Sequence, residues 1–326
     1  MSVVDCAEQR VLRQESVTKE DALILAEQPT GELCAAADRI RRHFCGDKFD
    51  LCTIISAKSG HCPEDCKFCA QSACYHTAAE CYPMLPRETI AARAESDAKR
   101  GVLRLSLVTS GRRLSDREVD EACRAIRAIR AGSPIHICVS MGLLTQEQYG
   151  RLKEAGADRV HNNLETSARY FPTICTTHTI ADKVAAIRAA QAVGMKICSG
   201  GILGLGETME DRIDMAILLR ELGIRSVPVN VLNPISGTPF EKNPRLSIDE
   251  IRTTIAVFRF LLPDAAIRMA GGRGLMPDHG RLCFESGANA AISGDMLTTA
   301  GYTVETDLAL LAELGYRPAL IDKACR

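Results

Sequence analysis

Residues 51–72 read LCTIISAKSGHCPEDCKFCAQS and join a short β-branched run to a loop with three closely spaced cysteines. The run at 51–56 is the first of eight apolar or β-branched segments; the others lie at 103–108, 135–140, 159–164, 196–202, 226–232, 266–270 and 290–294. Longer amphipathic stretches separate most of these segments, and this alternation is typical of βα units around a parallel sheet. Eight such units predict an α/β fold, a closed or nearly closed (β/α)8 barrel of the TIM type.

The helices of this barrel are predicted from their periodicity and from the residues at their ends. We expect them at 87–101, 116–132, 145–157, 179–194, 208–223 and 247–262. Several open after Ser, Thr or Asp, and Gly101, Gly132, Gly194 and Gly223 stand where a C-cap favours glycine. The residues before the first strand are predicted to form helices on the outside. We therefore expect an N-terminal helical extension at 1–45 and one barrel domain at 46–326.

The composition is that of an ordinary globular protein. Apolar residues make up 46% of the chain and charged residues 25%, and the net charge is −1. Lysines and arginines are spread along the helical stretches, which argues against a nucleic-acid surface. The polar N-terminus has no apolar core of a signal peptide, and no window approaches about 18 uninterrupted apolar residues. We expect a cytoplasmic protein that acts on small molecules and contacts neither membrane nor nucleic acid.

The chain has fifteen cysteines, which are poor candidates for structural disulfides in a reducing cytoplasm. Metal or redox chemistry is the leading explanation for that number. Five cysteines lie in helix-like or terminal segments and are interpreted as ordinary thiols: Cys6, Cys34, Cys45, Cys123 and Cys325. Four more lie in loops or at helix starts and are set aside as spectators: Cys74, Cys81, Cys175 and Cys283.

Cys62, Cys66 and Cys69 follow the first strand directly, at the barrel end where catalytic loops converge. A [4Fe–4S] cluster normally takes four thiolates, so three from one loop leave one iron open to a small ligand. An open iron can chelate the amino and carboxylate groups of S-adenosylmethionine and cleave it reductively to a 5′-deoxyadenosyl radical. Phe68 stands where an aromatic ring could lie against the adenine, although simple loop packing explains it equally well.

Two other interpretations of this loop stay open. A zinc site would need a fourth ligand, for which Cys74, His61 and His76 are available. Alternatively, Cys66 and Cys69 alone could form a redox pair. The glycine-rich stretch CSGGILGLGET at 198–208 lets backbone approach a ligand closely, and Gly200 and Gly201 are predicted to face the methionine part of the cofactor.

Several motifs together resemble the biotin synthase family from about residue 45 to about residue 310. They are SAKSGHCPEDCKFCAQS, HNNLETS, TTHT, CSGGILGLGE, NPISGTP, IRMAGGR, GANAAISGD and LTT, in that order. The resemblance implies a (β/α)8 barrel, a homodimer, and insertion of sulfur between C6 and C9 of dethiobiotin with cleavage of S-adenosylmethionine. It also implies an electron donor such as flavodoxin or ferredoxin, and an auxiliary iron–sulfur cluster inside the barrel that supplies the sulfur.

The ligands of the auxiliary cluster are where this chain departs from the better-known family pattern. By the resemblance, cysteines belong on strands two, three and five and an arginine on strand seven. Here Cys138, Cys198 and Arg268 match, but Ser106 occupies the position on strand two. A hydroxyl binds iron less well than a thiolate, so the usual [2Fe–2S] ligand set is incomplete. Our hypothesis is that Cys52 on strand one substitutes and that the cluster is larger, with an extra sulfide; the alternative is that Cys52 fills the core.

The resemblance also assigns polar residues to the substrate and to S-adenosylmethionine. By the resemblance, Asn163 contacts both substrate and cofactor and Glu165 holds the ribose of the cofactor, while the amide of Asn162 could by its chemistry also bond the cyclic urea of the substrate. Lys58 and Lys183 are weaker candidates for the carboxylates of substrate or cofactor. Another radical enzyme of the same barrel, such as a hydrogenase maturase or an amino-acid mutase, is the alternative function, and a non-catalytic metal-binding or sulfur-carrier protein is a third.

Overall fold

The computed structural model describes all residues except 295–296, 298–300 and 322–326. Cys325 and parts of the GANAAISGD and LTT stretches therefore lie outside the described residues. Within the described part, we find no helix with the length and apolar character needed to cross a bilayer.

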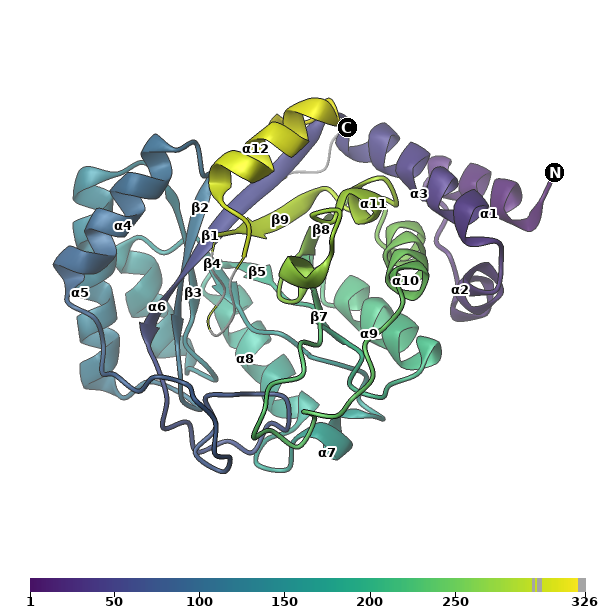
Figure 1. Cartoon of the computed structure of the whole chain (residues 1–326). Helices are drawn as coiled ribbons and strands as arrows, with labels where there is room; N and C mark the ends of the chain where they lie inside the picture. Colours follow the sequence, from purple (N-terminus) through teal and green to yellow (C-terminus); the bar gives the residue numbers. More distant parts are fainter. Residues whose placement is uncertain (295–296, 298–300, 322–326) are drawn as a thin grey trace.

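A parallel sheet forms the centre of the molecule (Figure 1). The eight predicted strands are confirmed as β1 (Lys48–Lys58), β2 (Arg104–Thr109), β3 (His136–Ser140), β4 (Arg159–His161), β5 (Lys196–Cys198) continued by β6 (Gly201–Leu203), β7 (Ser226–Val231), β8 (Ala266–Met269) and β9 (Ala290–Ser293). Their order in the sheet is β5-β4-β3-β2-β1-β9-β8-β7-β6, and a short β10 (Arg317–Pro318), which we did not predict, pairs with β1.

The fifth predicted strand is interrupted, and this interruption closes the barrel. Its first part, β5, pairs with β4, and its second part, β6, pairs with β7. Between them, the Ser199 N–H donates to the carbonyl of Ser226 at 3.0 Å, while the Glu165 N–H donates to the carbonyl of Gly200 at 3.0 Å. One stretch of chain thus bonds to the strands on both sides, and the sheet curves back on itself as a barrel.

All six predicted helices are confirmed and lie around the sheet (Figure 1). They are α4 (Arg87–Lys99), α5 (Asp116–Gly132), α6 (Gln146–Ala155), α8 (Ile180–Ala192), α9 (Met209–Glu221) and α10 (Ile248–Leu261). Four of them begin with a reciprocal capping box, whose N-cap residues are Ser115, Thr145, Thr179 and Thr208. Of the four predicted C-cap glycines, Gly132 is instead the last residue of α5, whereas the other three have positive φ.

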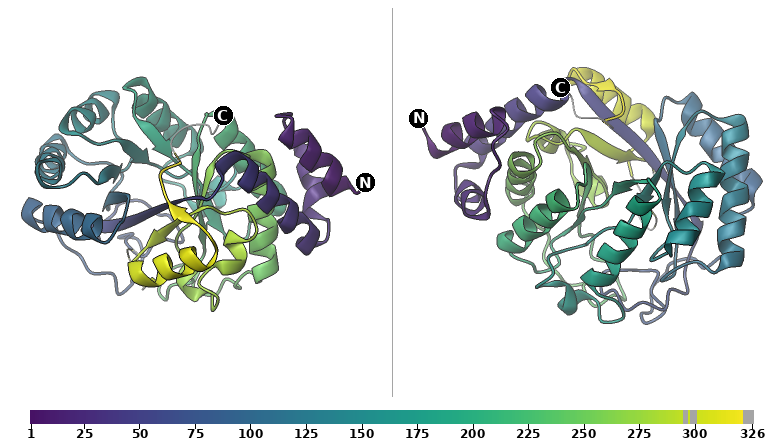
Figure 2. Two further views of the ribbon diagram at one scale, coloured as in Figure 1. Left: turned by 90° about the horizontal axis from the view of Figure 1, so that it is seen from above. Right: turned by 180° about the vertical axis from the view of Figure 1, so that it is seen from behind.

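Residues 1–45 form three helices, α1 (Val3–Leu12), α2 (Lys19–Ala26) and α3 (Thr30–Cys45), as expected. Figure 2 shows them on one side of the barrel, where α3 packs against α10 and α2 against α9 and α10. Four short elements were not predicted: α7 (Phe171–Ile174), η1 (Arg273–Leu275), α11 (Arg281–Phe284) and α12 (Val304–Glu313).

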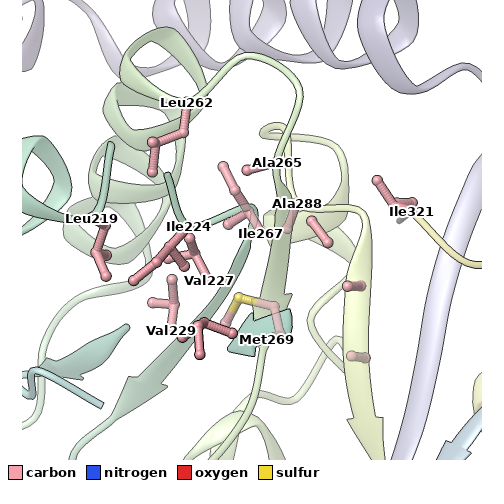
Figure 3. Packing of buried hydrophobic residues seen from close by; sticks show 14 of the residues in the cluster. Leu219, Ile224, Val227, Val229, Leu262, Ala265, Ile267, Met269, Ala288 and Ile321 are labelled. Carbon is pink, nitrogen blue, oxygen red and sulfur yellow. The ribbon is translucent and has the colours of Figure 1, made fainter. Parts of the chain in front are cut away.

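Alternate residues of each strand face either the helices or the barrel interior. On β7, Val227 and Val229 are buried in the layer between strands and helices, together with Ile267 and Met269 of β8 (Figure 3). The residue between the last two, Arg268, lines a cavity inside the barrel. The apolar residues therefore hold the helices on the sheet, and the intervening positions build the site.

Candidate functional site

Two cavities meet at the end of the barrel that carries the cysteine loop. The larger has a volume of about 350 Å³ and lies inside the barrel, and the smaller has about 150 Å³. Cys69 lines the larger cavity, Cys62 and Cys66 line the smaller, and Phe68 and Glu165 line both. The loop predicted to bind a cluster thus stands at the border between the two spaces.

The cysteine loop is held closed by its own backbone. The Cys62 N–H donates to the carbonyl of Gln71 at 3.1 Å, the Ala73 N–H to the carbonyl of Cys62 at 2.7 Å, and the Cys69 N–H to the carbonyl of Cys66 at 3.0 Å. Three thiols on one closed loop fit a [4Fe–4S] cluster with one open iron. Burial raises the pKa of Cys62, and it raises that of Cys69 to about 11, so both thiols keep their protons until a metal displaces them.

The residues proposed for a zinc site on this loop are not gathered around it. Cys74, His61 and His76 are exposed. Instead, the Sγ of Cys175 lies 3.7 Å from the Sγ of Cys66. The hydrogen bond between these thiols raises the pKa of Cys66 and lowers that of Cys175 to about 6. From the sequence, Cys175 was set aside as a spectator; in the structure its thiol contacts a predicted ligand of the cluster.

Four predicted ligands of the auxiliary cluster line the larger cavity. Cys52 of β1, Cys138 of β3, Cys198 of β5 and Arg268 of β8 are all buried there. Ser106 of β2 lines it too, and it pairs with Cys138 in the register of β2 and β3. The substituted serine therefore occupies a position on the cavity wall, next to a predicted ligand, and a thiol on a different strand faces the same space.

The deep end of the cavity is rich in guanidinium groups. Arg104 and Arg159 line it together with Arg268, and sequence reasoning missed the first two. The carboxylate of Asp50, which is 1% exposed, lies 3.0 Å from Nη1 of Arg104 and 2.9 Å from Nη2 of Arg268. Although burial alone favours the protonated acid, these two cations hold the pKa of Asp50 well below its usual range. Arg268 also donates to the Sγ of Cys52 at 3.1 Å.

His161 of β4 is a further cavity residue that sequence reasoning missed. It pairs with Cys198 in the register of β4 and β5. Burial alone raises the pKa of Cys198, but a hydrogen bond with His161 and the charges of Arg268 and Arg159 lower it to about 6. The period of two in β4 could have found both residues, because Arg159 and His161 alternate with the buried Val160.

The two asparagines that follow β4 face different cavities. Asn162 lines the smaller one, where its Oδ1 accepts from Lys183 Nζ at 3.5 Å. Asn163 lines the larger one and donates to Glu165 Oε2 at 3.3 Å. Glu165 has a φ of 72°, a left-handed conformation that is uncommon for a residue with a side chain. Its backbone strain is held by hydrogen bonds with Gly200 and Ile202.

Three other predicted site residues contact the protein itself. Lys58 Nζ lies 2.5 Å from Glu118 Oε1 of α5 and lines neither cavity. A Cβ on Gly200 would lie 1.9 Å from the carbonyl oxygen of Pro228, and one on Gly201 would lie 2.4 Å from that of Glu165. The close approach of neighbouring backbone therefore explains why both positions require glycine. Their role at the cofactor stays a prediction.

Two family models match the chain. Residues 58–219 match the Radical SAM superfamily, and residues 228–317 match the Biotin and Thiamin Synthesis associated domain. The sequence is 54% identical to a biotin synthase of Brachyspira hyodysenteriae over 96% of this chain and 94% of the relative. It is 53% identical to a biotin synthase of Akkermansia muciniphila over 97% of this chain and 98% of the relative.

Solved structures share the fold at low sequence identity. A methylornithine synthase superposes with a TM-score of 0.84 at 20% identity, covering 97% of this chain and 98% of that chain. An FeFe-hydrogenase maturase from Carboxydothermus hydrogenoformans gives 0.82 at 18% identity, covering 97% and 79%. These two likenesses confirm the barrel fold, whereas the sequence relatives favour the biotin synthase interpretation over the maturase and mutase alternatives.

Proposed function

The chain belongs to the biotin synthase family, and on that premise we propose that it inserts sulfur between C6 and C9 of dethiobiotin to give biotin. One observation carries the proposal. Phe68 and Cys69 of the loop line the same cavity as Cys52, Cys138 and Cys198. A substrate in this cavity would therefore contact a radical source at one end and a sulfur source at the other.

As a radical S-adenosylmethionine enzyme, the chain uses a [4Fe–4S] cluster and S-adenosylmethionine. When bound, these groups supply the 5′-deoxyadenosyl radical that abstracts hydrogen, and the auxiliary cluster supplies the sulfide. In our proposal, Cys62, Cys66 and Cys69 hold the first cluster. Phe68 lies against the adenine, and Asn163 and Glu165 hold the ribose and amino-acid parts at the border of the two cavities.

We assign the auxiliary cluster to Cys52, Cys138 and Cys198, with Arg268 beside it. The donor set fits, because three buried thiols face one cavity and Arg268 donates to the Sγ of Cys52 at 3.1 Å. A cluster held by thiolates is anionic, and the buried guanidinium groups of Arg104, Arg159 and Arg268 would stabilise it. The same charges favour a cluster larger than [2Fe–2S], since an added sulfide adds negative charge.

The walls between the two ends suit dethiobiotin. Ile54, Val108 and Ile202 offer apolar surface for the methylene chain and for the carbons that react. Asn163 and Asn230 offer amides for the cyclic urea. Asn230 already donates to the carbonyl of Gly201 at 3.0 Å and accepts from the Gly271 N–H at 2.9 Å, so its orientation is fixed before substrate binds.

Further features complete the proposal; of these, the homodimer and the electron donor rest on the family resemblance. The protein acts in the cytoplasm as a homodimer, and a flavodoxin or a ferredoxin supplies its electrons. Lys183 holds a carboxylate in the smaller cavity, which it lines with Asn162. The barrel domain begins at residue 46, after α3 ends at Cys45 and before β1 starts at Lys48.

An anaerobic assay tests the function. Protein reconstituted with iron and sulfide is incubated with a strong reductant, S-adenosylmethionine and dethiobiotin, and 5′-deoxyadenosine, 9-mercaptodethiobiotin and biotin are quantified together. We expect biotin to accumulate while the auxiliary cluster loses sulfide. Deoxyadenosine without any sulfur-containing product would keep the radical chemistry and refute dethiobiotin as the substrate.

A further inference from the structure

We propose that the cluster-free protein binds one divalent metal ion such as Zn²⁺ through Cys66, Cys175 and His178. The ligand atoms of these three residues lie within 4.8 Å of one another. Sulfur insertion does not need this site, so the inference is independent of the proposed function. It concerns the state of the protein before its radical cluster is assembled.

The spacing of the ligand atoms fits a tetrahedral metal. Two thiolates on one zinc, each with a Zn–S bond of about 2.3 Å, lie about 3.8 Å apart at the tetrahedral angle. The Sγ atoms of Cys66 and Cys175 are 3.7 Å apart. The imidazole of His178 has Nδ1 at 3.3 Å and Nε2 at 3.9 Å from the Cys175 Sγ, on either side of the separation of about 3.6 Å that a sulfur and a nitrogen ligand of zinc require.

The imidazole is oriented by a carboxylate, as is usual for a metal-binding histidine. Nδ1 of His178 contacts Oε2 of Glu64, and both side chains are less than a tenth exposed. The hydroxyl of Thr177 donates to the same carboxylate oxygen at 2.8 Å, and the ring of Phe171 packs edge-on against the imidazole. A proton on Nδ1 shared with Glu64 leaves the lone pair of Nε2 for a metal.

The metal ligands come from two segments of the chain that are joined by hydrogen bonds. Cys66 lies on the cysteine loop, whereas Cys175 and His178 lie in the turn after α7. Asp65 accepts from the backbone N–H groups of Thr176 at 2.9 Å and Thr177 at 3.2 Å. The ligands are therefore held in place without any metal, which lowers the entropic cost of binding one.

Cys66 makes the metal and the radical cluster mutually exclusive. A thiolate that closes the zinc site is one of the three that the [4Fe–4S] cluster needs, so zinc must leave before the cluster forms. The metal binds the thiolate forms of Cys66 and Cys175, so it displaces any thiol proton still present, and no electron transfer is involved. We expect one equivalent of Zn²⁺ to slow cluster reconstitution in the wild-type protein and to slow it less in Cys175→Ser.

Cobalt titration tests the site directly. Cluster-free protein, kept anaerobic and reduced, is titrated with Co²⁺, and the thiolate-to-cobalt charge-transfer absorption is followed before displacement by Zn²⁺. We expect Cys175→Ser and Cys66→Ser each to lose one bound equivalent of Co²⁺, and Glu64→Gln to weaken binding of Co²⁺ about tenfold.

Two variants serve as controls for the cobalt titration. Cys62→Ser, which changes the same loop, and Cys74→Ser, at an exposed thiol, should keep the bound equivalent. Loss in Cys62→Ser with retention in Cys175→Ser would place the metal on the loop alone and overturn the proposal.

A measurement on the unaltered chain guards against variants that fail to fold. Wild-type protein with and without one equivalent of Zn²⁺ is treated with a thiol alkylating reagent, and the modified peptides are identified by mass spectrometry. We expect zinc to protect Cys66 and Cys175 at least tenfold while Cys62 stays reactive. Protection of Cys62 and Cys69 without Cys175 would contradict the site.

Discussion

The two groups of cysteines that this fold brings to its cavities are built in opposite ways. Cys62, Cys66 and Cys69 lie on one loop, which closes through its own backbone hydrogen bonds beside the carboxylates of Glu64 and Asp65. Cys52, Cys138 and Cys198 lie on three strands, beside buried guanidinium groups. The first group depends on local chain geometry, and the second depends on strand register. A slip of one residue in any of the three strands would turn a thiol away from the cavity.

The largest effect should come from removing a thiol of the loop. Cys69→Ser leaves two thiolates for a cluster that needs three, so we expect deoxyadenosine formation to fall by at least ~100-fold. Iron analysis and the paramagnetic resonance signal of the reduced cluster check the loss. Cys123→Ser, at a buried thiol of α5 outside both cavities, is the control and should retain the signal. Unchanged deoxyadenosine formation in Cys69→Ser would mean that the loop does not hold the cluster.

Removing an interior thiol should abolish sulfur insertion but leave the formation of deoxyadenosine intact. In Cys52→Ser we expect auxiliary iron and biotin to be lost, about tenfold or more, while deoxyadenosine formation persists. The iron and sulfide content of the variant, measured together with its products, shows whether Cys52 is a ligand of the auxiliary cluster. Auxiliary iron equal to that of the wild type would show that Cys52 only fills the core, as Cys123 does.

The buried charges beside the interior thiols can be tested by measuring the stability of the protein. Arg268→Met removes a cation from the buried carboxylate of Asp50, and breaking a buried ion pair from one side costs about 3–5 kcal/mol. We expect a loss near the lower value, since Arg104 still pairs with Asp50. Urea unfolding of the cluster-free protein measures it.

The matched control for that measurement is a pair at the surface. Arg100 binds Glu305 through two hydrogen bonds of 2.8 Å, yet both side chains are exposed. Arg100→Met should therefore cost less than about 1 kcal/mol. Equal losses in the two variants would contradict the role assigned to the interior charges.

The smallest effect concerns Asp211, a buried carboxylate of α9 away from both clusters. Burial opposes its ionisation, but hydrogen bonds from the Ser167 hydroxyl at 2.6 Å and from the Thr208 N–H lower the pKa of Asp211 to about 2. A lowered pKa stabilises the fold above the unfolded pKa of about 4, by ~2 kcal/mol, and this stability is lost as the pH falls towards 2. The difference in unfolding free energy between wild type and Asp211→Asn should thus shrink as pH is lowered from about 5. A pH-independent difference would assign the effect to packing.

Much of the fold could be predicted because its signals are local. The period of two in the strands, the capping boxes before four helices and the closing glycines are each carried by a few neighbouring residues. The break after Cys198 could not be predicted, since it depends on two hydrogen bonds to opposite sides: the Ser199 N–H donates to Ser226 of β7, and the carbonyl of Gly200 accepts from the Glu165 N–H after β4. The short helix α7 escaped prediction because one turn has almost no periodicity.

The candidate site was predicted unevenly for the same reason. The sequence alone determined the three-cysteine loop, because its spacing and its place after the first strand are local properties. The resemblance led us to place Cys52 with Cys138 and Cys198, but only the tertiary structure brought these three residues to one cavity and showed that Arg104, Arg159 and His161 line it. It also decided that Cys175 meets Cys66, through the docking of the α7 turn on the cysteine loop. Contacts between segments far apart in the chain depend on strand register and barrel closure, and no local pattern of residue types contains them.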